Sequence, residues 1–180
     1  YHFLLVQGWH EVPLRKESFK DVNNSAMEAT PHVEALDWII QEMEECVDMV
    51  DDSAYDLSPS YVKKNTVMGI LARVCLWRAG HPADGGKPFY EKAAYWANEV
   101  KKSGKHRLNP DLYKIWKCMA SDTYDTEYNE SIWEAEFFGN RSADGQGNYT
   151  DGRIGNVIGN IQKCTASPGN GYSYGFYAPT

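Results

Sequence analysis

The sequence lacks the motifs that would point to a metal protein, a disulfide scaffold or a common hydrolase. Its four cysteines are widely spaced with no Cys-x-x-Cys pair, and its five histidines show no metal-ligand spacing. It has no Gly-x-Ser-x-Gly motif and no Ser-His-Asp arrangement. No apolar run approaches the roughly 18 residues that a membrane-spanning helix needs. The sequence therefore predicts no cofactor and no metal site.

Positive charge is also scarce in this chain of 180 residues. It has 18 Lys and Arg against 25 Asp and Glu, which gives a formal net charge of -7. The only basic clusters are Lys63-Lys64 and Lys101-Lys102, and both are interpreted as solvated helix ends. Because a phosphate-binding surface needs clustered Lys and Arg, nucleic acid is excluded as a partner.

The cysteines divide into two kinds. Cys46 and Cys75 fall on apolar faces of expected helices, so both are predicted to be buried free thiols. Cys118 and Cys164 lie in less regular sequence, and whether they pair in an oxidising compartment stays open.

Residues 31–51 predict a one-faced amphipathic helix, since apolar side chains recur there at three- and four-residue spacing between acidic ones. Thr30 is the expected N-cap, and Pro31 the first helical residue. The expected buried side chains of this helix are those of Ala35, Leu36, Ile39, Ile40, Met43, Cys46, Val47 and Val50.

Two further helices are expected to follow as a pair. Residues 64–79 are apolar on more than one side, including Met68 and Leu76, which predicts a helix lying between neighbours and ending before Gly80-His81-Pro82. The next helix has an inward stripe of Phe89, Ala93, Trp96, Ala97 and Val100. Small alanines allow close helix approach, so the pair resembles one tetratricopeptide-type unit, which needs roughly three repeats to form a stable stack.

The two ends of the chain differ from this helical middle. Residues 1–8 predict an aromatic-rich apolar helix, followed by extended backbone at Val12-Pro13-Leu14 because proline disfavours a helical residue before it. Residues 110–116 predict a short helix, and the alternation over residues 131–138 predicts a half-buried strand with Trp133 on its inner side. Beyond Gly139 the abundance of Gly, Asn and Asp predicts long loops. Trp77, Trp96 and Trp116 are expected in the core.

Taken together, these elements resemble the SusD/RagB family of surface nutrient-binding lipoproteins of Bacteroidetes. The segments that carry the resemblance are Trp9-His10-Glu11-Val12-Pro13-Leu14, residues 66–80, residues 90–105 with the turn Leu108-Asn109-Pro110, residues 129–134 and residues 177–180. Each motif alone is weak, whereas their order and spacing are specific.

The resemblance implies a mainly α fold: a tetratricopeptide-like helical repeat with a small strand and long irregular loops. Residues 1–180 would be a single SusD-like domain fragment, with a helical-repeat part over residues 1–117 and a strand and loop-rich ligand-side part over residues 118–180. Tyr1 is not Met and nothing before it caps a helix, so we expect an internal piece of a longer protein with any lipid anchor upstream.

The function that the resemblance implies is non-catalytic. Such a protein would bind oligosaccharide or another nutrient at the outer-membrane surface, as part of polysaccharide utilisation, and deliver it to a TonB-dependent, SusC-like transporter. Whether the cargo is a glycan or a peptide stays open.

The candidate ligand residues lie in the loops near the end of the chain, where aromatic rings could pack on sugar C–H faces and polar groups could bind hydroxyls. They are Tyr149, Arg153, Asn156, Tyr172, Tyr174 and Tyr177. The alternative is that these tyrosines cover the edge of the helical core, and composition alone favours that alternative. The family resemblance makes the ligand-binding role of these residues more favourable, but it does not select individual residues.

Two alternatives to nutrient capture belong to other classes. A plain helical-repeat scaffold would bind a protein partner instead. A glycan-cleaving enzyme would need paired carboxylates, and Glu134 and Glu136 would lie roughly 6.5 to 7 Å apart on one strand face, although a solvated polar face is the favoured interpretation.

Residues 144–148 imitate a calcium loop, but Tyr149 and Gly155 occupy positions that require Gly and Glu, which leaves only an irregular calcium site open.

Overall fold

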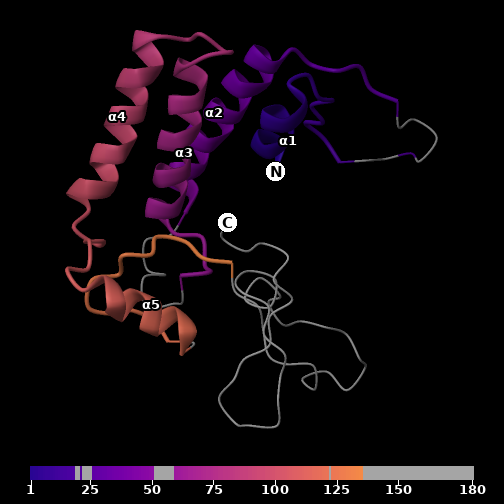
Figure 1. Ribbon diagram of the computed structural model, residues 1–180. Helices are drawn as coiled ribbons and strands as arrows, with labels where there is room; N and C mark the ends of the chain where they lie inside the picture. The colour runs from indigo at the N-terminus through magenta and orange to yellow at the C-terminus, as the bar shows by residue number, and fades with distance from the viewer. Residues whose placement is uncertain (19–20, 22–25, 51–58, 122, 136–180) are drawn as a thin grey trace, which may run out of the picture. The chain divides into compact units, whose positions relative to one another are not determined.

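The computed structural model describes residues 1–18, 21, 26–50, 59–121 and 123–135. The chain forms two compact units, Tyr1–Glu134 and Ala135–Thr180, and the elements below all belong to the first. Five α-helices occur in the described part: α1 (His2–Trp9), α2 (His32–Met49), α3 (Lys64–Ala79), α4 (Lys87–Lys102) and α5 (Leu112–Ala120) (Figure 1). The prediction of a mainly helical fold is confirmed.

The opening helix ends where the chain turns into extended backbone. His10, which follows α1, has a positive φ of 61°, and its N–H donates to the carbonyl of Val6. The chain then forms one isolated antiparallel bridge, in which the N–H of Thr30 donates to the carbonyl of Val12 at 2.9 Å. The extended stretch predicted at Val12 is therefore present, and the bridge returns the chain to the start of α2.

Helix α2 buries one face, as its spacing predicts. Its buried residues are Ala35, Leu36, Ile39, Ile40 and Val47. Two details of the prediction are wrong. Pro31 rather than Thr30 occupies the N-cap position, because the backbone of Thr30 is engaged in the bridge. Cys46 is exposed whereas the next residue, Val47, is buried, because neighbouring positions of a helix point in different directions.

Helix α3 is the centre of the core and lies between α2 and α4, which confirms the prediction from its apolar sides (Figure 1). Leu71, Val74 and Cys75 are fully buried. Of the expected second face, Met68 is buried but Leu76 is exposed, and Trp77, expected in the core, is exposed as well. The neighbouring helices cover one broad side of α3, and these two residues lie outside it. Trp77 still packs edge-on against Phe3 of α1, with ring centroids 6.2 Å apart.

Helix α4 packs on α3 through a narrower stripe than expected. Ala93 is buried, and Phe89, Trp96 and Val100 pack against the core. Ala97 is exposed, which corrects its place in the inward stripe. Positions 89, 93, 96 and 100 follow one line on the helix surface, whereas position 97 lies one step around the helix from it.

The last described segments differ most from the sequence expectations. Helix α5 continues to Ala120, and Trp116 is exposed instead of lying in the core. Residues 131–135 form no strand. The N–H of Glu134 donates to the carbonyl of Pro59 at 3.1 Å, but Pro59 has no N–H with which to return a ladder bond. Trp133, expected on the inner side, is exposed.

Candidate functional site

The six ligand residues predicted from the sequence lie outside the described residues, so their role stays a prediction. They are Tyr149, Arg153, Asn156, Tyr172, Tyr174 and Tyr177. Glu136 and residues 144–148 also lie outside, so the carboxylate pair and the calcium site stay open. Cys118, whose pairing with Cys164 the sequence left open, is a free thiol. Within the described part, polar and aromatic side chains gather in two places: a loop network at the start of α5, and the segment 131–134.

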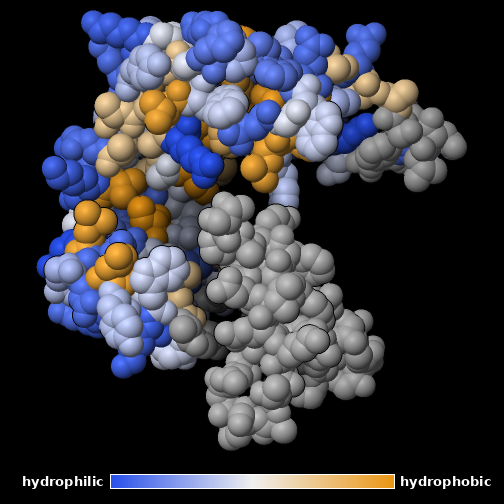
Figure 2. All heavy atoms as spheres, viewed as in Figure 1, coloured by the Kyte–Doolittle hydropathy of each residue, from blue (hydrophilic) through white to orange (hydrophobic). Residues whose placement is uncertain are grey.

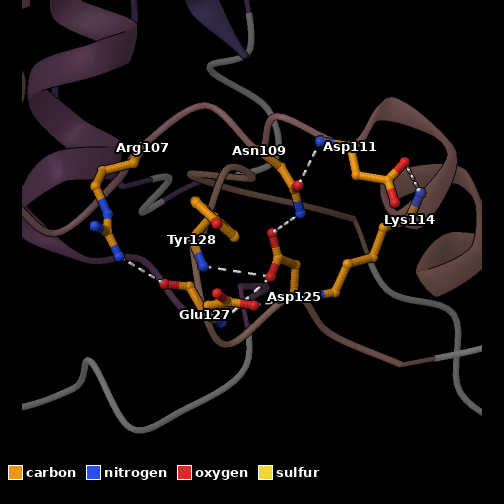
Figure 3. A network of polar contacts seen from close by, with 7 residues as sticks. All are labelled: Arg107, Asn109, Asp111, Lys114, Asp125, Glu127 and Tyr128. Atoms are coloured by element: carbon orange, nitrogen blue, oxygen red, sulfur yellow. Dashed lines mark hydrogen bonds and ion pairs between the residues drawn. The ribbon is translucent and has the colours of Figure 1, made fainter.

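Asn109 is the centre of the loop network (Figure 3). Its buried side chain donates from Nδ2 to Oδ2 of Asp125 at 2.8 Å and accepts at Oδ1 from the N–H of Asp111 at 2.9 Å. Its own N–H donates to Oε2 of Glu130 at 2.6 Å. One side chain therefore holds the entry to α5 and the segment 125–130 together.

Asp125 closes a turn on the other side of this contact. Its Oδ1 accepts from the N–H groups of Glu127 and Tyr128 at 3.2 and 3.3 Å. The backbone N–H of Arg107 donates to the carbonyl of Tyr128 at 2.9 Å, and its guanidinium lies 5.2 Å from the centre of the Tyr128 ring. Segments about twenty residues apart in sequence thus form one compact loop pair, as Figure 3 shows.

The same network fixes the first turn of α5. The Asp111 side chain caps the helix by accepting from the N–H of Lys114 at 3.2 Å. The Lys114 ammonium then reaches Oε2 of Glu127 at 2.8 Å and lies 5.8 Å from the Tyr128 ring centre. Helix α5 is consequently held by polar contacts at its N-terminus, and none of residues 112–119, whose burial is described, is buried.

These contacts shift the pKa values of the charged residues. The hydrogen bond from Lys114 lowers the pKa of Glu127, and the same bond raises the pKa of Lys114. Burial acts to raise the pKa of Asp125, but the hydrogen bonds from Asn109 and from the N–H groups of Tyr128 and Glu127 leave it lowered. All three side chains are therefore charged at neutral pH. Lys114 is bonded to Glu127, and Asp125 is bonded to Asn109 and to two backbone N–H groups. We interpret the network as a support for α5 rather than as an open polar pocket.

Helix α5 presents apolar side chains to solvent on this support. Figure 2 shows hydrophobic atoms on the visible face near this part of the molecule. The large exposed side chains of α5 and the preceding loop are Leu108, Leu112, Tyr113, Trp116 and Met119. Leu112, Trp116 and Met119 follow i, i+4, i+7 spacing, so they share one side of the helix.

The second gathering is a short strap, residues 131–134, held against the loop before α3. The indole Nε1–H of Trp133 donates to the carbonyl of Ser60 at 3.2 Å. On either side of it, the hydroxyl of Thr66 donates to the carbonyl of Ile132 at 3.4 Å, and the N–H of Glu134 donates to Pro59. The Trp133 side chain is thus fixed at its edge while 51% of the residue stays exposed.

Sequence reasoning missed two exposed aromatics in this place, Trp133 and Tyr61. The alternation over residues 131–138 placed Trp133 on an inner face because it assumed a pairing strand. The available signal was Pro59, since a proline removes one of the donors that a ladder would need, but nothing in the sequence brought residue 59 next to residue 134.

Other classes of site find no support in the described ranges. Within them, no group of three or more His, Cys, Asp or Glu side chains could hold a metal ion. None of the described helices is long and apolar enough to cross a membrane.

Two solved structures resemble this chain. A SusD homologue from Bacteroides thetaiotaomicron matches 89% of the chain with a TM-score of 0.72 and 24% sequence identity. A SusD superfamily protein from Parabacteroides distasonis matches 64% of the chain with a TM-score of 0.55 and 28% identity. The chain spans 31% and 24% of the lengths of these two proteins. No protein-family model and no protein of curated function matches the sequence. The fold is SusD-like, in agreement with the resemblance that the sequence motifs carry.

Proposed function

We propose that this chain is part of a non-catalytic nutrient-binding protein that captures oligosaccharides at the cell surface and passes them to a TonB-dependent, SusC-like transporter. The observation that carries the proposal is the SusD-like fold over 89% of the chain. The order and spacing of the sequence motifs support it independently.

The described residues are compatible with a binding protein built on a rigid support. Helices α2, α3 and α4 share one core, and the loop network fixes α5 and the segment 125–130. Exposed aromatic rings with fixed surroundings suit sugar recognition, because a sugar ring presents apolar C–H groups that pack on an aromatic face. An outer-membrane surface location and the candidate loop residues near the end of the chain belong to the same proposal.

A protein-binding scaffold is the second candidate, and one observation favours it. Leu112, Trp116 and Met119 form an exposed apolar stripe on α5, and such stripes are typical of helices that bind protein grooves. Under this alternative, the protein would bind no free oligosaccharide.

The test is isothermal titration calorimetry of the full-length protein with a panel of cello-, malto-, xylo- and mannohexaose, with chromatography of the same samples. Saturable binding with every hexaose recovered intact is the expected result. Shortened products would contradict the non-catalytic assignment. Failure of every hexaose to bind would overturn oligosaccharide capture and favour a peptide cargo or the scaffold.

A further inference from the structure

We infer that Trp133 is a saccharide-stacking residue, a ring fixed in advance on the helical unit to receive the apolar face of a sugar. This inference rests on the proposed function, because it names a contact residue for the same class of ligand. It is independent of the loop residues predicted from the sequence, since every contact that supports it lies within residues 59–66 and 131–134.

The first step of the argument is the fixed orientation of the indole. The hydrogen bond from Nε1 to the carbonyl of Ser60 satisfies the single polar group of the ring and restricts its rotation. The backbone on both sides is restrained as well, by Thr66 at Ile132 and by Pro59 at Glu134. A side chain held in this way loses little conformational entropy when a ligand packs on it, which favours binding.

The second step is that the ring remains available. Trp133 is 51% exposed although its polar edge is already bonded, so the solvent-facing part of the side chain is largely aromatic carbon. Tyr61, the residue after the Ser60 carbonyl, is itself 54% exposed and offers a second ring and a hydroxyl. Aromatic carbon next to hydrogen-bonding hydroxyl groups is the combination that a sugar ring requires.

Trp116 is a matched comparison within the same unit. It is 61% exposed, and its indole makes no hydrogen bond to any described residue. Its helical neighbours at i-4 and i+3 are Leu112 and Met119, which makes its surroundings apolar. Those surroundings suit a hydrophobic partner, so Trp116 serves as the control for Trp133.

The experiment measures calorimetric binding of the four hexaoses to the wild-type protein and to W133A, W133F and W116A. Loss of the ring in W133A should weaken the binding hexaose by about three- to tenfold, the usual range for one aromatic contact. W133F keeps an aromatic face and should lose about twofold or less, while W116A should bind like the wild type. Equal affinities of W133A and wild type would overturn the inference while leaving the proposed function intact. A wild type that binds no hexaose would overturn both the inference and the proposed function.

A direct readout covers the case in which W133A fails to fold. In ¹⁵N-labelled wild type, the indole N–H resonance of Trp133 is assigned by its absence from W133F. Its chemical shift should move during titration with the bound hexaose, and the Trp116 resonance should stay in place. A stationary Trp133 resonance at saturation would overturn the inference.

Discussion

Arg78 of α3 forms an ion pair with Asp37 of α2, in which the Arg78 side chain is buried and the Asp37 side chain is 47% exposed. The guanidinium Nε donates to Oδ1 of Asp37 at 2.7 Å, and a second donor, Nη1, reaches the carbonyl of Ala83 at 2.9 Å. The carbon at the centre of the guanidinium lies 4.4 Å from the centre of the Phe89 ring on α4. One buried side chain therefore connects α2, α3, the turn after α3 and α4.

Removal of the Asp37 carboxylate should destabilise the protein. In Asp37→Ala the buried Arg78 would keep its bond to Ala83 but lose its counter-ion, which should cost about 2 kcal/mol of unfolding free energy. The matched control is Asp48→Ala, because Asp48 is far more exposed and its pair with Lys64 is longer, at 3.6 Å. Urea denaturation followed by circular dichroism compares the two variants. Equal midpoints would show that the Asp37–Arg78 pair contributes no more than a surface pair.

Gly85 should resist substitution for a steric reason. A Cβ at this position would lie 2.5 Å from both Nη1 of Arg78 and a ring carbon of Phe89, and 2.6 Å from the Arg78 carbonyl oxygen. A backbone carbonyl cannot move aside cheaply, so Gly85→Ala should lower the unfolding free energy by about 1 to 3 kcal/mol.

Gly69 is the matched control because it lies inside α3, where a new Cβ meets nothing within 4 Å. Gly69→Ala should raise stability by about 0.5 to 1 kcal/mol through helix propensity. Thermal denaturation of both variants should give shifts of opposite sign, and a stabilised Gly85→Ala protein would contradict the close approach of Arg78.

The loop network should depend on pH at both extremes. The pKa values of Asp125 and Glu127 are lowered in the folded protein, so their contribution is present above their unfolded values and is lost as the pH falls below about 4. The pKa of Lys114 is raised, so its contribution is present below about pH 10 and is lost as the pH rises through its folded value.

Hydrogen exchange checks the acid limb of this prediction. The N–H groups of Arg107 and Tyr128 both donate inside the network, so their protection, corrected for intrinsic exchange, should fall on acidification to about pH 3. Asp125→Asn removes one titrating group and should reduce the pH dependence at Tyr128. Constant protection at both amides from neutral to acid pH would refute the linkage.

The thiols of Cys46 and Cys75 should react very differently. Burial raises the pKa of Cys75 to about 11, so it holds almost no thiolate at neutral pH and is also shielded from reagents. Cys46 is exposed on α2. With Cys118 and Cys164 replaced by Ser, the Cys46 thiol should react with Ellman's reagent within minutes, and the Cys75 thiol should react only after unfolding. Cys46→Ser should abolish the fast reaction, and fast labelling that persists in it would contradict the buried position of Cys75.

The sequence predicted the helices better than it predicted their exposed sides. The periodicity over residues 64–79 predicted the bounds of α3 and its place between neighbours, because spacing alone determines which residues share a helix face. It could not predict how much of each helix its neighbours cover, so Leu76 and Trp116 were expected inside and are exposed.

The contacts of the strap, residues 131–134, could not be predicted from the sequence for a different reason. Its contacts join residues 66 or more positions apart, including Trp133 to Ser60, and local alternation carries no information about such partners. The same holds for Asn109 and Asp125, whose polarity predicted only a loop. A strand pattern needs a partner with free donors and acceptors, and Pro59 supplies only an acceptor.

Two alanines of α4 give the sharpest test of how that helix is oriented. Ala93 is buried in the core that α4 shares with α3, whereas Ala97, one turn along, is exposed. Ala93→Trp should lower the unfolding free energy by about 1 to 3 kcal/mol through overpacking, whereas Ala97→Trp should change it by about 0.5 kcal/mol or less. Chemical denaturation of the two variants under identical conditions measures the difference. The reverse order would contradict the orientation of α4 in which Ala93, and not Ala97, faces the core.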